Sequence, residues 1–260
     1  MSLVVHSGKR AAPGTIAIGQ VGNVDDNVIV VYDPRAPKDA RTKNLVLPGR
    51  VIKPIPYLDL AHKQRSATFV SGVSGSGKSR LGAALIRRLR FLRKDLQRPA
   101  VVFSTTVIDD PAYAGINHVE FISLEDPRFL ELEVSQLEDR IVVFDDHENL
   151  KNPKLAKYAL DFLKDVLERT RKLGVDVVVI NHMTQNYHAT RNIIFECDTY
   201  YLNVAQNRTS SRRFLTAYSE LPRALIDQLC AQEYDNPFVF VTYHKCAPCF
   251  ISYEDTVLLV

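Results

Sequence analysis

The sequence predicts an α/β fold, with a central, mostly parallel β-sheet flanked by helices and a small β-rich extension at the N-terminus. Apolar runs at 141–144 and 177–180 lack polar alternation, which is typical of strands buried on both faces of a parallel sheet. Strand-like and helix-like segments alternate from about residue 64 onward. A glycine-rich turn at 72–77 joins one apolar strand directly to a helix, and strand–turn–helix units of this kind build such sheets.

The local patterns place each element along the chain. Residues 1–55 form the β-rich extension, because short β-like pieces at 15–18, 27–32 and 44–47 alternate with Gly, Pro, Asn and Asp turns. Residues 56–260 form the larger domain. We expect its strands at 67–71, 100–104, 140–145, 175–181 and 198–203, with more strand at 238–241 and 257–260. We expect its helices near 78–95, 153–172 and 221–232.

Composition is that of an ordinary globular protein. The chain has 260 residues, of which 46% are hydrophobic and 24% charged, and its net charge of +3 is too small to indicate nucleic-acid binding by itself. No apolar run approaches the ~20 residues that cross a bilayer. The N-terminal segment, interrupted by Lys9, Arg10 and Pro13, lacks a signal-peptide pattern.

Cysteine usage favours a reducing compartment over a disulfide scaffold. The four cysteines are Cys197, Cys230, Cys246 and Cys249. The last two form a lone C-x-x-C near His244, without the second ligand pair that a structural zinc site needs. Metal binding, a redox pair and ordinary structural cysteines all remain open for Cys246 and Cys249.

The glycine-rich turn is a complete phosphate-binding loop, because residues 72–79 match G-x-x-x-x-G-K-S/T between a strand and a helix. Its glycines allow successive backbone N–H groups to face one anion, beside the positive end of the helix dipole. Lys78 reaches the β- and γ-phosphates in such loops, and Ser79 ligates Mg²⁺. The sequence therefore predicts an ATP site of the P-loop type at Gly72, Val73, Ser74, Gly75, Ser76, Gly77, Lys78 and Ser79.

A second motif supplies the acids. The apolar run 141–144 delivers Asp145 and Asp146 at the carboxyl edge of the sheet, where ligands collect in open α/β folds. We expect Asp145 to be the partner of Ser79 at Mg²⁺. Asp146 is expected to orient or deprotonate the attacking water, and Glu148 is a second candidate for that role.

The spacing of these motifs favours an ATPase. Between Lys78 and Asp145 there is room for a helix, the strand 101–104 and further elements, so we expect an extra strand between the loop strand and the acid strand. That arrangement is typical of ATPases that activate water. A GTPase is disfavoured because no N-K-x-D segment is found. A small-molecule kinase remains possible, although such an enzyme normally carries an arginine-rich lid.

A third motif combines the basic segment 169–172, the strand 175–180 and the polar residues 181–185. Basic residues before a strand lie at the edge opposite to that strand's phosphate end, so they do not serve their own nucleotide. Arg171 is therefore either an ordinary surface arginine or an arginine finger that acts on a neighbouring subunit. The polar residues after the strand are placed to sense the γ-phosphate.

Together these segments resemble the FtsK–HerA superfamily of DNA-pumping ATPases, in particular the genome-packaging ATPases of the poxvirus and giant-virus type. The resemblance covers roughly residues 52–260. The segment from Arg171 through the following strand is its more specific part, since the loop and acid motifs are shared by many P-loop ATPases. The matching residues are 72–79, 102–105, Asp109, Asp110, Tyr113, 141–146, 171–175, 185–187 and Arg191.

The resemblance implies an ATP- and Mg²⁺-dependent motor that drives double-stranded DNA into a capsid as a pentameric or hexameric ring. It also implies a capsid or inner-membrane partner, and a place in the viral factory of the host cytoplasm or in the virion. By the same likeness Arg171 is the finger, and the sensor is either His182 or the pair Thr184 and Gln185. The chain departs from cellular pumps at Asp146, where they usually carry glutamate, because the aspartate side chain is one methylene shorter.

Two basic segments each have a structural and a functional interpretation. The first lies on the helix after the loop, where we expect a solvated face, with a DNA- or capsid-facing patch as the alternative. Its members are Arg87, Arg88, Arg90, Arg93, Lys94 and Arg98. The second, at 207–213, is expected to be a polar loop, either a surface turn or a loop that tracks DNA phosphates. Rival functions for the whole chain are another P-loop enzyme, such as a kinase or helicase-like ATPase, and a non-catalytic assembly factor that uses ATP as a latch.

Overall fold

The computed structural model describes residues 2–7, 15–21, 28–33, 35, 44–47, 52–54, 66–105, 110–182, 190–245, 249–253 and 256–259. The chain divides into two compact units. One unit comprises Met1–Tyr57 with Thr199–Val260, and the other comprises Leu58–Asp198. The boundary between residues 55 and 56 stays a prediction, and Thr199–Val260 group with the N-terminal strands in this division.

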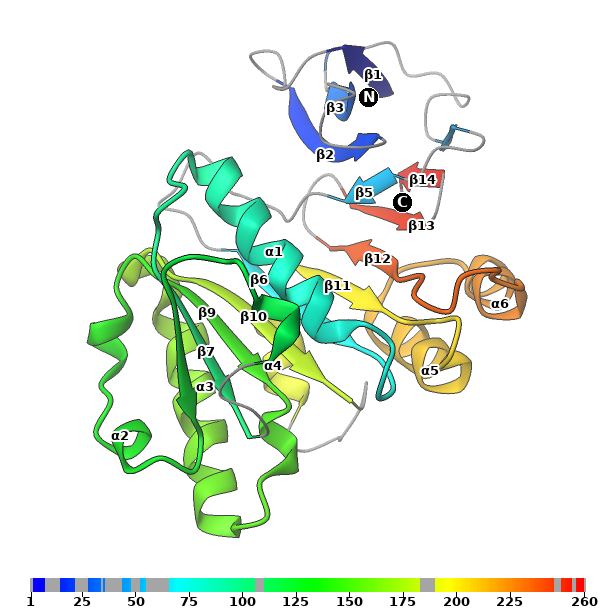
Figure 1. Cartoon of the computed structure of the whole chain (residues 1–260). Coiled ribbons are helices and arrows are strands. Elements are labelled where there is room, and N and C mark those ends of the chain that lie inside the picture. The colour runs from blue at the N-terminus through cyan, green and yellow to red at the C-terminus, as the bar shows by residue number, and fades with distance from the viewer. Residues whose placement is uncertain are drawn as a thin grey trace. The chain divides into compact units, whose positions relative to one another are not determined.

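The unit Leu58–Asp198 is built on a parallel sheet in the order β6-β10-β9-β7-β8 (Figure 1). Its strands are β6 (Ala67–Ser71), β7 (Ala100–Ser104), β8 (Val119–Ser123), β9 (Ile141–Asp145) and β10 (Asp176–Asn181). An extra strand does separate the loop strand β6 from the acid strand β9, as expected. That strand is β10, whereas β7 lies on the other side of β9.

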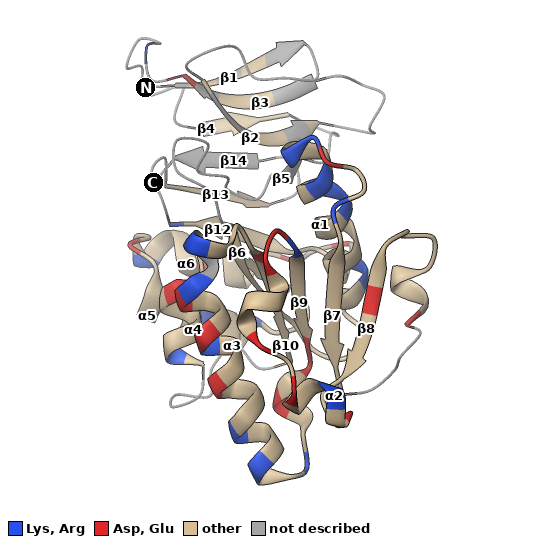
Figure 2. Ribbon diagram, turned by 90° about the vertical axis from the view of Figure 1, so that its left-hand side faces the viewer, with Lys and Arg blue, Asp and Glu red and all other residues tan. Residues whose placement is uncertain are grey.

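Helices cover both faces of this sheet. The helix α1 packs on β6, β9 and β10 from one face, and α3 packs on β10 from the other (Figures 1 and 2). The helices and short 3₁₀ turns are α1 (Lys78–Arg93), η2 (Pro111–Tyr113), α2 (Pro127–Leu130), η3 (Val134–Leu137), η4 (His147–Asn149), α3 (Pro153–Leu173) and α4 (Arg191–Glu196). The predicted α/β class, a mostly parallel sheet flanked by helices, is confirmed.

Aromatic packing holds α3 against the sheet. Phe103 of β7 and Phe144 of β9 are fully buried, with ring centroids 4.9 Å apart. Phe162 of α3 lies edge-on to Phe103 at 5.9 Å, and Phe129 of α2 contacts both rings, at 5.4 Å from Phe103 and 5.2 Å from Phe162. Such ring pairs add to the area they bury, so this cluster fixes the position of β9, which carries the acids.

The basic residues at 87–98, after the phosphate-binding loop, are only partly solvent-exposed. Arg87 and Lys94 are exposed, but Arg90 and Arg98 are 5% and 6% exposed, and the expected solvated face is wrong for them. Arg90 donates to the carbonyl oxygens of Arg98, Asn117 and His118.

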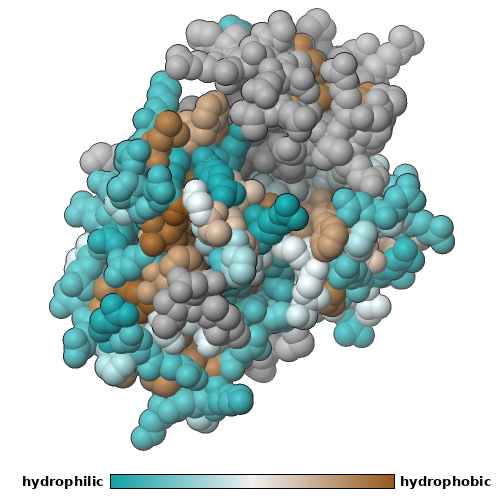
Figure 3. Space-filling view, viewed as in Figure 1, coloured by the Kyte–Doolittle hydropathy of each residue, from teal (hydrophilic) through white to brown (hydrophobic). Residues whose placement is uncertain are grey.

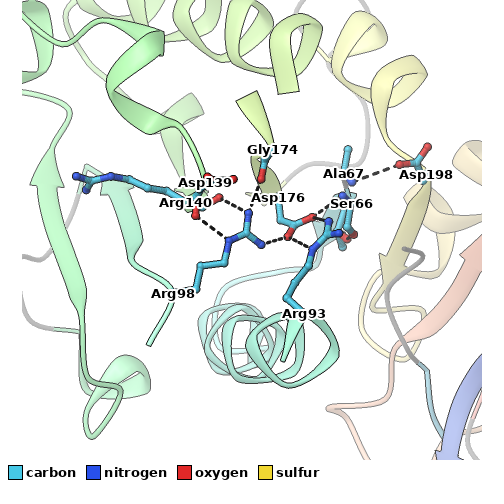
Figure 4. A network of polar contacts seen from close by, with 10 residues as sticks. Ser66, Ala67, Arg93, Arg98, Asp139, Arg140, Gly174, Asp176 and Asp198 are labelled. Atoms are coloured by element: carbon cyan, nitrogen blue, oxygen red, sulfur yellow. Dashed lines mark hydrogen bonds and ion pairs between the residues drawn. The ribbon is translucent and has the colours of Figure 1, made fainter. Parts of the chain in front are cut away.

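Arg98 and Arg93 both form ion pairs with Asp176, which is fully buried at the start of β10 (Figure 4). The Asp176 carboxylate also accepts from the Ser66 backbone at 2.6 Å. Arg98 donates in addition to backbone carbonyls of Asp139, Arg140 and Gly174. Both arginines have a structural role at the amino edge of the sheet, because Arg98 satisfies backbone carbonyls there and Arg93 neutralises the buried Asp176.

The other unit is rich in antiparallel strands. The N-terminal strands form a sheet in the order β1-β3-β2-β5, and a second series runs β4-β14-β13-β12-β11. Their bounds are β1 (Ser2–Ser7), β2 (Ile16–Val21), β3 (Val28–Asp33), β4 (Asn44–Val46), β5 (Ile52–Pro54), β11 (Thr199–Leu202), β12 (Val241–His244), β13 (Phe250–Tyr253) and β14 (Thr256–Leu259). A small core of Leu3, Ile18, Val21, Val30 and Phe250 joins them. The predicted β-rich N-terminal extension is confirmed.

The same unit contains α5 (Arg208–Tyr218) and α6 (Arg223–Ala231). The loop expected at 207–213 is therefore wrong, because Asn207 caps a helix that begins at Arg208. Phe214 and Leu215 are buried, and burial of this apolar face stabilises a helix that also includes the basic residues before it.

The face of the molecule in Figure 3 is largely hydrophilic, and its apolar areas are interrupted by polar side chains. The exposed large apolar residues among those described are spread over several elements; they are Val5, Val46, Phe91, Leu96, Leu130, Phe195 and Phe238. Within the described part of the chain, no helix combines the length and apolar character required to cross a membrane.

Candidate nucleotide site

The phosphate-binding loop leaves β6 after Ser71 and enters α1 at Lys78. Gly75 and Gly77 have φ values of 77° and 85°, a left-handed conformation that favours glycine. Gly77 is the N-cap of α1 and offers no side-chain cap, so the first N–H groups of the helix have no capping side chain. The loop is anchored because Gly72 N–H donates to the Asn181 carbonyl of β10 at 3.3 Å.

Asp145 ends β9 beside the start of α1. One of its oxygens, Oδ2, accepts from the Tyr113 hydroxyl at 3.3 Å, and the carboxylate also takes a hydrogen bond from the Ser79 side chain. Burial raises the pKa of Tyr113, so its hydroxyl keeps the proton that it donates. The other oxygen, Oδ1, is buried and has no hydrogen-bond partner among the described residues. Carboxylate and hydroxyl oxygens are the ligands that Mg²⁺ prefers, so Asp145 and Ser79 fit this ion.

Asp146 turns its carboxylate toward His182. Its backbone is left-handed, with φ 57°, and its N–H donates to the Ile180 carbonyl at 3.0 Å. Asp146 Oδ2 lies 2.8 Å from His182 Nε2, and Oδ1 is buried without a partner in the described part of the chain. The nearby Glu148 instead accepts the backbone N–H of His182 at 2.5 Å.

Lys78 lies among these acids. Its ammonium group donates to the Val73 carbonyl at 3.1 Å and lies 3.2 Å from His182 Nδ1. Burial lowers the pKa of Lys78, and the charges of Asp146, Asp145 and Glu148 oppose that shift. The loop lysine and all three predicted acids therefore share one site at the carboxyl edge of the sheet.

The arrangement suits a triphosphate with Mg²⁺. Positive charge and free N–H groups come from Lys78 and the start of α1, and both suit phosphate oxygens. Buried oxygens of Asp145 and Asp146 that have no partner among the described residues lie beside them. Ser76 Oγ is likewise buried without a partner among the residues described. These oxygens of Asp145, Asp146 and Ser76 are buried polar atoms that a nucleotide, a cation or water would satisfy.

The structure places Asn181, the first of the polar residues 181–185 expected to sense the γ-phosphate, at this site. The side chain of Asn181 is fully buried, and neither its oxygen nor its nitrogen has a partner in the described regions. It ends β10 between Ser71 and Asp145, so its amide lies at the phosphate edge. The signal was present, because Asn181 is the first polar residue after an apolar run.

Gly82 brings Tyr113 into the site. A Cβ at this position would lie 2.7 Å from Ile180 Cδ1 and 2.9 Å from Tyr113 Oη. Glycine therefore lets the tyrosine hydroxyl reach Asp145 across α1. No local pattern indicates this, because the contact joins residues far apart in the sequence.

Arg171 is not brought to this site. It lies in the last turn of α3, whose end at Leu173 precedes the amino end of β10, whereas His182 follows its carboxyl end. Gln185, like Thr184, lies outside the described residues. The role of Gln185 as sensor therefore stays a prediction. His182 is in contact with both Lys78 and Asp146.

The stability of the nucleotide-free protein should depend on the charge of Asp145. Burial, followed by the charge of Asp146, raises the pKa of Asp145 to about 6. The folded state thus binds this proton more tightly than the unfolded chain, so stability falls as pH rises from the ordinary carboxyl value through about 6. We expect Asp145→Asn to raise the free energy of unfolding near pH 8 by up to about 3 kcal/mol, and by roughly half as much near pH 5. Urea unfolding of both proteins measures this, and an equal gain at both pH values would contradict it.

The fold resembles that of solved ATPases. No family model matches the chain. An uncharacterized protein of Sputnik virophage is 25% identical over 227 residues, which cover 84% of each chain. The structure of B204, the DNA-packaging ATPase from Sulfolobus turreted icosahedral virus, matches 75% of this chain and 98% of its own, with a TM-score of 0.52 and 11% identity.

A second solved structure is the cytoplasmic domain of the type VII secretion ATPase EccC from Thermomonospora curvata. It matches 87% of this chain and 30% of its own, with a TM-score of 0.50 and 14% identity. At such identities the likeness establishes the fold. The resemblance to viral genome-packaging ATPases is thus confirmed at the level of the fold, which is that of a P-loop NTPase.

Proposed function

We propose that this protein is an ATPase whose turnover drives double-stranded DNA into a viral capsid. The observation that carries the ATPase proposal is the convergence of Lys78, Asp145 and Asp146 beside the phosphate-binding loop. The motor proposal rests on the fold shared with a viral DNA-packaging ATPase and on the motif pattern in the sequence.

In the proposed reaction, the loop from Gly72 to Ser79 binds the triphosphate through backbone N–H groups, and Lys78 neutralises the β- and γ-phosphate oxygens. Ser79 and Asp145 would hold Mg²⁺, which supplies charge neutralisation at the phosphates. Asp146 orients water for in-line attack and accepts its proton, with Glu148 as the alternative base. Asp146 is favoured because its Oδ1 is buried without a partner among the described residues, whereas Glu148 accepts the His182 backbone N–H.

The motor would act as a homo-oligomeric ring, pentameric or hexameric, in which Arg171 of one subunit stabilises charge on the γ-phosphate bound by its neighbour. A capsid or inner-membrane component would anchor the ring, and the site of action would be the viral factory in the host cytoplasm, with carry-over into the virion. Relatives and neighbours of viral origin support this placement.

Phosphate release with and without double-stranded DNA tests the proposal. We expect Mg²⁺-dependent ATP turnover that rises with added DNA and falls by at least about 10³-fold in Lys78→Ala. Binding of ATP without turnover would instead favour a nucleotide latch used in assembly. Transfer of phosphate to an added acceptor would favour a kinase. ATP turnover that does not change with DNA would contradict the proposed DNA-translocating motor.

A further inference from the structure

We propose that His182 is a positioning residue that ties Lys78 to Asp146 in the nucleotide-free site and releases Asp146 for catalysis when Lys78 engages the γ-phosphate. The proposal rests on the proposed ATPase function and specifies how that site is kept inactive without substrate. Its basis is that one imidazole contacts both residues, with Nδ1 3.2 Å from Lys78 Nζ and Nε2 2.8 Å from Asp146 Oδ2.

Hydrogen-bond chemistry fixes the direction of both contacts. An ammonium group can only donate, so His182 Nδ1 must be the acceptor toward Lys78. An imidazole that accepts at Nδ1 carries its proton on Nε2, and an ionised carboxylate can only accept. His182 Nε2–H therefore donates to Asp146, and the chain runs from Lys78 through His182 to Asp146 in one direction.

The backbone holds this imidazole in place from both sides. The His182 N–H donates to Glu148 Oε1 at 2.5 Å, and the Asp146 N–H donates to the Ile180 carbonyl two residues before His182. The end of β10 and the turn after β9 are thereby joined by backbone as well as by side chains. The side chains of His182 and Asp146 are 28% and 17% exposed, so both remain partly accessible to solvent.

A bound triphosphate competes directly for the first link in the chain. Phosphate oxygens carry negative charge and attract the Lys78 ammonium more strongly than the neutral Nδ1 does, so Lys78 would leave Nδ1 for the phosphate. His182 then loses the partner that fixes its ring, and its grip on Asp146 weakens. The acid thus becomes available to water only when a phosphate occupies the lysine.

Two substitutions separate the two contacts. His182→Gln places an amide near the position of Nε2 and retains a donor to Asp146, while the partner of Lys78 is lost. His182→Asn places an amide near the position of Nδ1 and retains an acceptor for Lys78, while the contact with Asp146 is lost. His182→Ala removes both contacts.

For each variant the experiment measures the Kd of ATPγS by calorimetry and kcat from phosphate release at saturating ATP. We expect His182→Gln to bind ATPγS about five-fold more tightly, because Lys78 no longer has to leave a partner, with kcat lowered roughly ten-fold because the amide holds Asp146 whether or not Lys78 is engaged. We expect His182→Asn to bind ATPγS with the wild-type Kd and to raise kcat about two-fold, because Asp146 is no longer held. His182→Ala should combine tighter binding with a kcat that is not lowered.

A purely structural role for His182 would weaken binding and turnover together and lower the melting temperature, and that outcome would overturn the proposal. Identical behaviour of the Gln and Asn variants would also overturn it. The proposed function fails separately, if wild-type turnover is absent or does not depend on Lys78. If turnover depends on Lys78 but the His182 variants behave like the wild type, only the proposed role of His182 is contradicted.

Discussion

Replacing Arg171 by alanine is expected to lower ATP turnover by roughly 10³-fold or more while leaving ATP affinity nearly unchanged, because a trans finger acts on the transition state. The position of the residue excludes a role in its own site. Arg171 precedes β10, whose six residues span roughly 20 Å to the phosphate edge. One arginine side chain does not cover that distance, so a contribution from Arg171 has to reach a second subunit.

Mixing two inactive variants tests the direction of this contribution. Arg171→Ala subunits keep an intact phosphate loop, and Lys78→Ala subunits keep the arginine. Turnover should partly recover when the two are mixed, because some interfaces then pair an intact loop with an intact finger. Lys172→Ala is the matched control, since the neighbouring side chain is exposed, and it should behave like the wild type.

Other results would contradict the finger. Mixtures as inactive as their components would place Arg171 in another role. Loss of ATP binding together with turnover in Arg171→Ala, accompanied by a lower melting temperature, would indicate that the residue stabilises the end of α3 instead.

The core of the fold and most of the nucleotide site follow from local sequence. The strands β6 and β7 begin and end at the predicted residues, and β9 and β10 differ by one residue at their starts, because continuous apolar runs bounded by turns determine them. The motif around Lys78 and the acid pair Asp145 and Asp146 converge because carboxyl ends of parallel strands share one edge.

Features that depend on distant contacts could not be predicted in this way. The strand β10 lies between β6 and β9. Its pairing with β6 joins segments about a hundred residues apart, which no local pattern specifies. The burial of Arg90 and Arg98 depends on carbonyls from other elements. The start of α5 was assigned to a loop because its first residues are polar and basic, whereas the buried face begins only further along.

Replacing Asp176 by asparagine is expected to lower the free energy of unfolding by roughly 3–5 kcal/mol, because two guanidinium groups lose the charge that compensates their burial. Asp176 is fully buried, and the side chains of Arg93 and Arg98 are 12% and 7% exposed. Urea unfolding measures the effect. Asp161→Asn on α3 is the matched control, because its ion pair with Lys164 is exposed and such pairs contribute at most about 1 kcal/mol.

A second substitution tests why Asp176→Asn is destabilising: because its ion pairs are lost, or because the arginines keep an uncompensated buried charge. If the cost of Asp176→Asn arises from stranded arginines, adding Arg98→Met should restore part of the lost stability, because it removes one uncompensated charge while keeping an apolar stem. Costs that simply add would show instead that the backbone bonds of Arg98 dominate. That alternative has a structural basis, since Arg98 also donates to the carbonyls of Asp139, Arg140 and Gly174 and so holds the turn between α3 and β10 (Figure 4).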